Sequence, residues 1–222
     1  MSRLRVGVLA SGRGSNLQAI LDAARRIISQ KGIDGLSMRA IAHAIDYSPA
    51  GLYEYFGSKE EIVAAVCQQG HARLTQTMGL VDIDLPPDEY LLEIGLAYID
   101  FAVRNPDHFR LMFNDPITGM SPDISQEDVL AQIDDQESSF GVLLRAVQRG
   151  IDTGVFKTGP GYNTLEMAHT AWSLVHGMAM LRIGNLSAFP MDFAAVEREG
   201  LRLLGAVSYT HLTLPTTGHG CS

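Results

Sequence analysis

Apolar positions between residues 17 and 207 recur at intervals of three and four, the spacing of one helix face. Stretches rich in proline, glycine and acidic residues interrupt this period and mark connections. No stretch between Gly35 and Val207 shows convincing strand alternation, and no internal repeat has a fixed period. We therefore expect an all-α fold of about nine helices. They begin at Leu17, Ser37 and Ser48, then cover residues 60–77, 89–105, 106–113, 125–153, 162–183 and 189–207.

Helix-start signals are densest between residues 36 and 62. Ser37 is placed to cap one helix and Ser48 a second, with Pro49 at the first position of the second helix. The run from Ser58 to Glu61 matches a capping box for a third helix. Starts this close together predict two short helices and a tight turn, the helix-turn-helix motif. The inward positions are Ile41, Ala42, Ile45, Leu52 and Phe56.

The outward positions of the second short helix are suited to DNA. Small residues from Ser48 to Gly51 allow a close approach to base edges in a major groove. Tyr53 and Lys59 supply a hydroxyl and a charge that can bind phosphates. The alternative is a helical bundle that does not bind DNA. The predicted DNA-binding residues are Ser37, Arg39, Tyr47, Ser48, Pro49, Ala50, Tyr53, Tyr55 and Lys59.

Residues 48–56 (Ser-Pro-Ala-Gly-Leu-Tyr-Glu-Tyr-Phe) with Lys59-Glu60 resemble the signature of the TetR family of transcriptional regulators. Residues 20–24, Gly32 and Ile41-Ala42 are similar to what precedes the signature in that family. The resemblance covers residues 17–65 and implies a three-helix DNA-binding head. It also implies a homodimer, formed through the last two helices, that binds a roughly palindromic operator and in most cases represses transcription.

The second part of the chain resembles a ligand-binding domain of TetR-type regulators that is named after a Trp-His-Gly signature. Residues 98–102, Asn105-Pro106 and residues 109–113 are similar to it, and Trp172, His176 and Gly177 match the signature. The resemblance implies a pocket for a small-molecule effector among residues 86–183. Core packing is the simpler explanation for each candidate lining residue: His108, Phe109, Met112, Phe140, His169, Trp172 and His176.

The formal net charge of −8 argues against a general nucleic-acid coat. Residues 1–60, however, hold eight Lys/Arg and five Asp/Glu, so a basic head precedes an acidic body. No apolar run is long enough to span a membrane, and the two cysteines form no metal or disulfide pattern. We expect a cytoplasmic protein without a cofactor or a bound metal.

Both ends of the chain depart from this pattern. Residues 5–23 resemble the opening of phosphoribosylglycinamide formyltransferases, with Gly14-Ser15-Asn16 at the position of the phosphate loop. The alternative function is therefore a phosphate-binding enzyme fragment, although no later segment matches that family. We interpret residues 1–16 as an extension foreign to the regulator, joined in a chimeric reading frame.

The tail, residues 208–222, resembles translated sequencing-adapter DNA and is expected to be disordered. A metal-binding tail with His211, His219 and Cys221 is the alternative for it. The expected domains are then residues 17–65 for the helix-turn-helix head and residues 66–207 for ligand binding and dimerisation.

Overall fold

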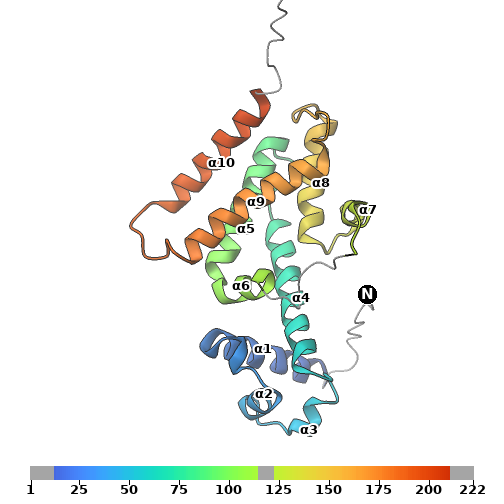
Figure 1. Ribbon diagram of the computed structural model, residues 1–222, viewed down its shortest axis with the longest axis vertical. Helices are drawn as coiled ribbons and strands as arrows, with labels where there is room; N and C mark the ends of the chain where they lie inside the picture. Colours follow the sequence, from blue (N-terminus) through green and yellow to red (C-terminus); the bar gives the residue numbers. More distant parts are fainter. Residues whose placement is uncertain (1–12, 115–122, 211–222) are drawn as a thin grey trace, which may run out of the picture. The chain divides into compact units, whose positions relative to one another are not determined.

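The computed structural model describes residues 13–114 and 123–210. Within these ranges the chain forms ten α-helices and two 3-10 helices, with one isolated bridge between Gly159 and Tyr162 and no strand. The all-α fold expected from the sequence is thus confirmed (Figure 1). No helix in the described ranges has the length and apolar character needed to cross a lipid bilayer. Residues 1–12 of the N-terminal extension and the tail from residue 211 lie outside the described residues.

The chain divides into two compact units. The first comprises residues 1–71 and 107–120, and the second comprises residues 72–106 and 121–222. The first unit contains the predicted helix-turn-helix. It also includes most of helix α6 (Pro106–Asn114), a segment that the sequence analysis assigned to the second domain.

The first unit is built from α1 (Arg13–Lys31), a 3-10 turn (Ile33–Gly35), α2 (Met38–Ala44), α3 (Pro49–Leu52) and the first turns of α4 (Lys59–Met78). In Figure 1 the blue helices α1 to α3 gather around the start of α4. Removal of apolar side chains from water holds them together. The side chains of this core that are at most 2 % exposed include Ile20, Leu36, Ile41, Leu52, Ile62, Val66 and Phe109.

In the second unit, α5 (Pro87–Arg104) contacts α8 (Ser139–Asp152), α9 (Thr164–Ile183) and α10 (Phe193–Thr210). The most extensive contact joins α5 and α9, where Gly95 lies against Val175: a Cβ at Gly95 would be 3.1 Å from Val175 Cγ1. The core of this unit includes Ile94, Ile99, Leu144, Val147 and Ala179.

The single helix expected over residues 125–153 is instead α7 (Gln126–Leu130), a 3-10 turn (Ala131–Asp134) and α8. The break occurs because Ser138 caps a new helix by accepting a hydrogen bond from Gly141 N at 3.0 Å. The preceding backbone folds back onto Gly141, where a Cβ would lie 2.8 Å from Asp135 O. Arg145 Nη1 stabilises this turn by donating a hydrogen bond to Ile133 O at 2.7 Å.

The other large differences from the expected boundaries concern α1 and α10. Helix α1 begins at Arg13, four residues before the predicted Leu17. Helix α10 begins at Phe193 instead of residue 189, because Asp192 Oδ1 accepts from Ala195 N at 3.2 Å and caps it there. It continues to Thr210, past the predicted start of the tail at residue 208.

Candidate nucleic-acid interface

The turn between α2 and α3 is set by its own residues. Ser37 Oγ accepts from Ala40 N at 3.1 Å and Ser48 Oγ accepts from Gly51 N at 2.9 Å, so both predicted caps are confirmed. Asp46 has a φ of 51°, a left-handed conformation that aspartate tolerates better than most residues. Tyr47 N then donates back to Ala42 O at 2.9 Å and closes the turn.

The predicted DNA-binding residues are accessible in the described first unit. Tyr53 is 56 % exposed, although it directly follows Leu52, which is fully buried. Tyr47, Tyr55 and Lys59 are half-buried. Since a side chain must be accessible to meet a duplex, the whole predicted set is compatible with contact. Its exposed members are Ser37, Arg39, Ser48, Pro49, Ala50 and Tyr53.

Two tyrosines of the predicted set contact each other. The rings of Tyr47 and Tyr55 meet edge to face with centroids 6.4 Å apart. A hydrogen bond to the Tyr55 hydroxyl is the main cause that holds the pKa of Tyr47 above its usual value. Asn16 Nδ2 donates to Tyr55 Oη at 3.2 Å. Sequence reasoning missed Asn16, because its partner is 39 residues away and no local pattern marks such a pair.

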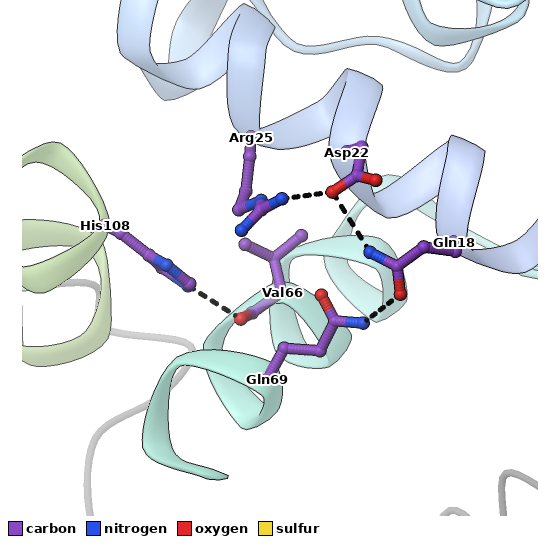
Figure 2. A network of polar contacts seen from close by, with 6 residues as sticks. All are labelled: Gln18, Asp22, Arg25, Val66, Gln69 and His108. Atoms are coloured by element: carbon purple, nitrogen blue, oxygen red, sulfur yellow. Dashed lines mark hydrogen bonds and ion pairs between the residues drawn. The ribbon is translucent and has the colours of Figure 1, made fainter. Parts of the chain in front are cut away.

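Figure 2 shows how polar side chains join α1 and α6 to α4 in the first unit. Gln69 Nε2 donates to Gln18 Oε1 at 3.1 Å, and Gln18 Nε2 donates to Asp22 Oδ1 at 3.0 Å. Asp22 also forms an ion pair with Arg25. On the other side of α4, His108 Nε2 lies 2.9 Å from Val66 O (Figure 2). Because a carbonyl only accepts, Nε2 carries the hydrogen.

Helix α6 rests on a glycine of α4. A Cβ at Gly70 would lie 2.7 Å from His108 Nε2, so a larger residue there would displace the His108 and Met112 side chains. Phe109 is fully buried and Met112 is 2 % exposed in the same contact region. Burial, and after it the charge of His108, lowers the pKa of His71. Three of the predicted pocket residues, His108, Phe109 and Met112, thus belong to the first unit.

The second unit contains a polar cluster that links α5 to α9. Trp172 Nε1 donates to Tyr98 Oη at 3.1 Å, and Tyr98 Oη lies 2.9 Å from His176 Nδ1. Indole is a donor only, so the phenol oxygen accepts from Trp172, and its hydroxyl hydrogen remains available for donation to His176 Nδ1. When the phenol donates in this way, Nδ1 of His176 accepts and the ring proton of the neutral imidazole is on Nε2.

Burial sets the protonation states of this cluster. It raises the pKa of Tyr98 well above the usual range of a phenol and lowers the pKa of His176. Both groups are consequently neutral at neutral pH. The predicted pocket residue Phe140 meets Trp172 edge to face at 5.9 Å, whereas His169 is exposed. Tyr98 was missed as a site residue, although a buried tyrosine in an apolar helix needs a partner for its hydroxyl.

Comparison with known proteins assigns both parts of the chain. Residues 20–66 match the model of bacterial regulatory proteins of the tetR family, and residues 91–204 match that of the tetracyclin repressor-like C-terminal domain. The regulator YobS of Bacillus subtilis is 29 % identical over 96 residues, which is 43 % of this chain and 50 % of YobS. The repressor NicS of Pseudomonas putida is 26 % identical over 159 residues, 71 % of this chain and 73 % of NicS.

A solved structure shares the fold. The TetR-family regulator PfmR of Thermus thermophilus superposes with a TM-score of 0.60 at 24 % identity, covering 84 % of this chain and 97 % of PfmR. The aligned part spans only half the length of YobS. Nothing in these comparisons supports a formyltransferase. With one family model on the head and another on half of the chain, the protein belongs to the TetR family of bacterial transcriptional regulators.

Proposed function

We propose that this protein is a repressor that binds, as a homodimer in the cytoplasm, an operator with two-fold symmetry. The observation that carries the proposal is the capped α2–α3 turn, which exposes small residues of α3 and Tyr53 directly after it, while Leu52 anchors the helix in the core. A helix of this kind fits a major groove when its outward residues are short. The similar protein NicS is named a transcriptional repressor, which supports repression as the direction of regulation.

Dimerisation through α9 and α10 is the second part of the proposal. Large apolar side chains are exposed on both helices: Leu181 is 51 % exposed on α9, and Val196 and Leu203 are 49 % and 57 % exposed on α10. Gly177 leaves room for a close approach to α9, because it has no side chain and a Cβ there would meet no heavy atom within 4 Å. Apolar surface of this kind is stabilised when a partner covers it. A two-fold dimer would present two heads to two half-sites.

The third part is release of the operator by a small molecule bound in the second unit. The cluster of Phe140, Trp172, His176 and Tyr98 combines aromatic faces with a few polar atoms, the composition typical of ligand sites. An effector that prefers the conformation unable to bind DNA would shift the population away from the operator. His108, Phe109, Met112 and His169 are further candidates predicted from the sequence.

The test is selection of bound duplexes from a random pool by the purified protein. We expect an enriched sequence with two-fold symmetry. Lys59→Ala should weaken binding to all duplexes and reduce the slope of log affinity against log salt by about 0.9, since one phosphate contact is lost. Lys157→Ala, at an exposed lysine of the second unit, is the matched control and should leave the slope unchanged. Failure to enrich any duplex in dilute buffer would refute DNA binding.

A further inference from the structure

We propose that Asn16, at the start of α1, is a positioning residue for the DNA-reading helix α3, acting through Tyr55 and Tyr47. The inference rests on the proposed DNA binding and names a residue outside the predicted contact set. Asn16 also lies in the segment that the sequence analysis regarded as foreign to the regulator.

Asn16 Nδ2 donates a hydrogen bond to Tyr55 Oη at 3.2 Å. Tyr55 follows α3 closely: its backbone N–H donates to Leu52 O at 3.0 Å, so it continues the last turn of that helix. Both side chains are half-buried, where a hydrogen bond is less exposed to competing water. The first turn of α1 is thereby tied to the end of α3.

Tyr55 in turn contacts Tyr47. Their rings meet at an interplanar angle of 66° with centroids 6.4 Å apart. Tyr47 precedes α3, and Tyr55 follows it, so the pair closes over the helix from both ends. Fixing the Tyr55 hydroxyl therefore limits the positions open to the Tyr47 ring.

Tyr47 contacts α3 itself. A Cβ at Gly51 would lie 2.6 Å from Tyr47 Cε1, so the ring lies directly on the backbone of α3. Helix α3 has four residues, and Leu52 is the one buried among them. A single anchoring side chain cannot fix the rotation of so short a helix. The Tyr47 ring supplies a second point of support, and Asn16 holds it through Tyr55.

This support of α3 should affect discrimination among DNA sequences more than overall affinity for DNA. Pro49 and Ala50 are on α3, and their distance from base edges changes if the helix rotates. Lys59 is on α4, so its position in space does not depend on the tyrosine pair. Loss of Asn16 should thus weaken binding to the cognate sequence while leaving contacts to phosphates, and therefore the salt dependence, as they are.

The experiment compares Asn16→Ala with Gln18→Ala. Gln18 is on the same helix and also loses side-chain hydrogen bonds, to Asp22 and Gln69, but none with Tyr55. Each variant is titrated with the duplex selected by the wild type and with a scrambled duplex of equal length, over a series of salt concentrations. Asn16→Ala should bind the selected duplex about fivefold more weakly, the effect of one hydrogen bond. Its affinity for the scrambled duplex and its salt slope should equal those of the wild type.

Two variants make the chain of contacts testable. Tyr55→Phe keeps the ring but removes the hydroxyl, and with it the hydrogen bonds to both Asn16 and Tyr47, so it should lose at least as much affinity for the selected duplex as Asn16→Ala. The double variant should lose no more than Tyr55→Phe alone, because the bond that Asn16→Ala removes is already absent there. Tyr55→Phe alone carries this comparison if Asn16→Ala fails to fold.

Several results would overturn the inference. A reduced salt slope for Asn16→Ala would make the residue a direct phosphate contact. Equal losses for Asn16→Ala and Gln18→Ala, or additive losses in the double variant, would reduce its role to general stability. If the wild type selects no duplex, DNA binding itself fails and the inference falls with it. If a duplex is selected and Asn16→Ala binds it normally, the inference alone is wrong.

Discussion

The guanidinium of Arg182 on α9 lies 2.6 Å from the carboxylate of Glu197 on α10, and Glu197 is only 5 % exposed. Arg182 also covers the ring of Phe193 at 5.4 Å from its centroid. Burial raises the pKa of Glu197, and the neighbouring guanidinium offsets part of this shift. This ion pair joins α9 to α10, the two helices proposed to form the dimer.

Glu197→Ala should destabilise the protein by about 2 kcal/mol, less than a fully buried pair loses, because the Arg182 side chain is 27 % exposed. The control is Glu199→Ala, which breaks the exposed pair with Arg202 and should change the free energy of unfolding by less than about 0.5 kcal/mol. Urea unfolding at one fixed protein concentration measures both. Equal losses in the two variants would contradict the assigned role of the Arg182–Glu197 pair.

Asp46 offers a test of the turn between α2 and α3. Its φ of 51° is unfavourable for residues branched at Cβ, so Asp46→Ile should lower the free energy of unfolding by about 1–2 kcal/mol. Asp46→Gly should stay within about 0.5 kcal/mol of the wild type, because glycine adopts this conformation freely. Asp34→Ile changes another exposed aspartate that lacks a positive φ, and it should have little effect on thermal unfolding.

The parts of the fold that the sequence predicted are those decided by neighbours along the chain. Ser37, Ser48 and Ser58 each bond an N–H three residues ahead, so a short window contains the whole interaction. The split of residues 125–153 was missed for the opposite reason. The apolar period continues through the break, and the close approach of residues 131–135 to Gly141 depends on tertiary packing.

The candidate site divides in the same way. Outward residues of α3 follow from the helical period and the caps. The pairing of Asn16 with Tyr55 and of Tyr98 with His176 spans 39 and 78 residues. Such pairs depend on how helices pack, which the spacing of apolar residues constrains only to a face. Trp172 and His176 were nominated from a family resemblance, and Tyr98 became visible only as their common partner.

Gly177 provides a test of the proposed dimer. A side chain there meets nothing within 4 Å in one chain, so Gly177→Leu should leave the helical content unchanged. In a dimer through α9 the added side chain would obstruct close packing and weaken association by at least about tenfold, an overpacking effect of 1–3 kcal/mol. Sedimentation over a range of concentrations measures this. Gly14→Leu on α1 is the matched control, since Gly14 also has open space around it, and it should remain as dimeric as the wild type.

Removal of the Tyr98 hydroxyl tests the polar cluster of the second unit. Tyr98→Phe deletes the acceptor of Trp172 Nε1 and the donor to His176 Nδ1, which should lower the free energy of unfolding by about 1–3 kcal/mol. Tyr162→Phe removes the hydroxyl of a half-exposed tyrosine between α8 and α9 and should have a smaller effect. Thermal unfolding followed by circular dichroism compares the two variants.

The same cluster predicts a dependence of stability on pH. Burial lowers the pKa of His176 in the folded protein, so the unfolded chain binds the proton more readily. The stabilisation is fully present above the unfolded pKa of about 6.5 and is lost as pH falls through the lower folded pKa. Protonation at Nδ1 would also bring a second donor toward Tyr98 Oη, which already accepts from Trp172.

We therefore expect the free energy of unfolding of the wild type to fall more steeply between neutral and mildly acidic pH than that of His176→Gln. His71→Gln should flatten the curve separately, because burial lowers the pKa of His71 as well and it belongs to the first unit. His169→Gln, at an exposed histidine of α9, is the matched control for the loss of an imidazole from that helix. A wild-type slope in the His176 variant, measured by urea unfolding at several pH values, would mean that burial does not hold the His176 imidazole neutral.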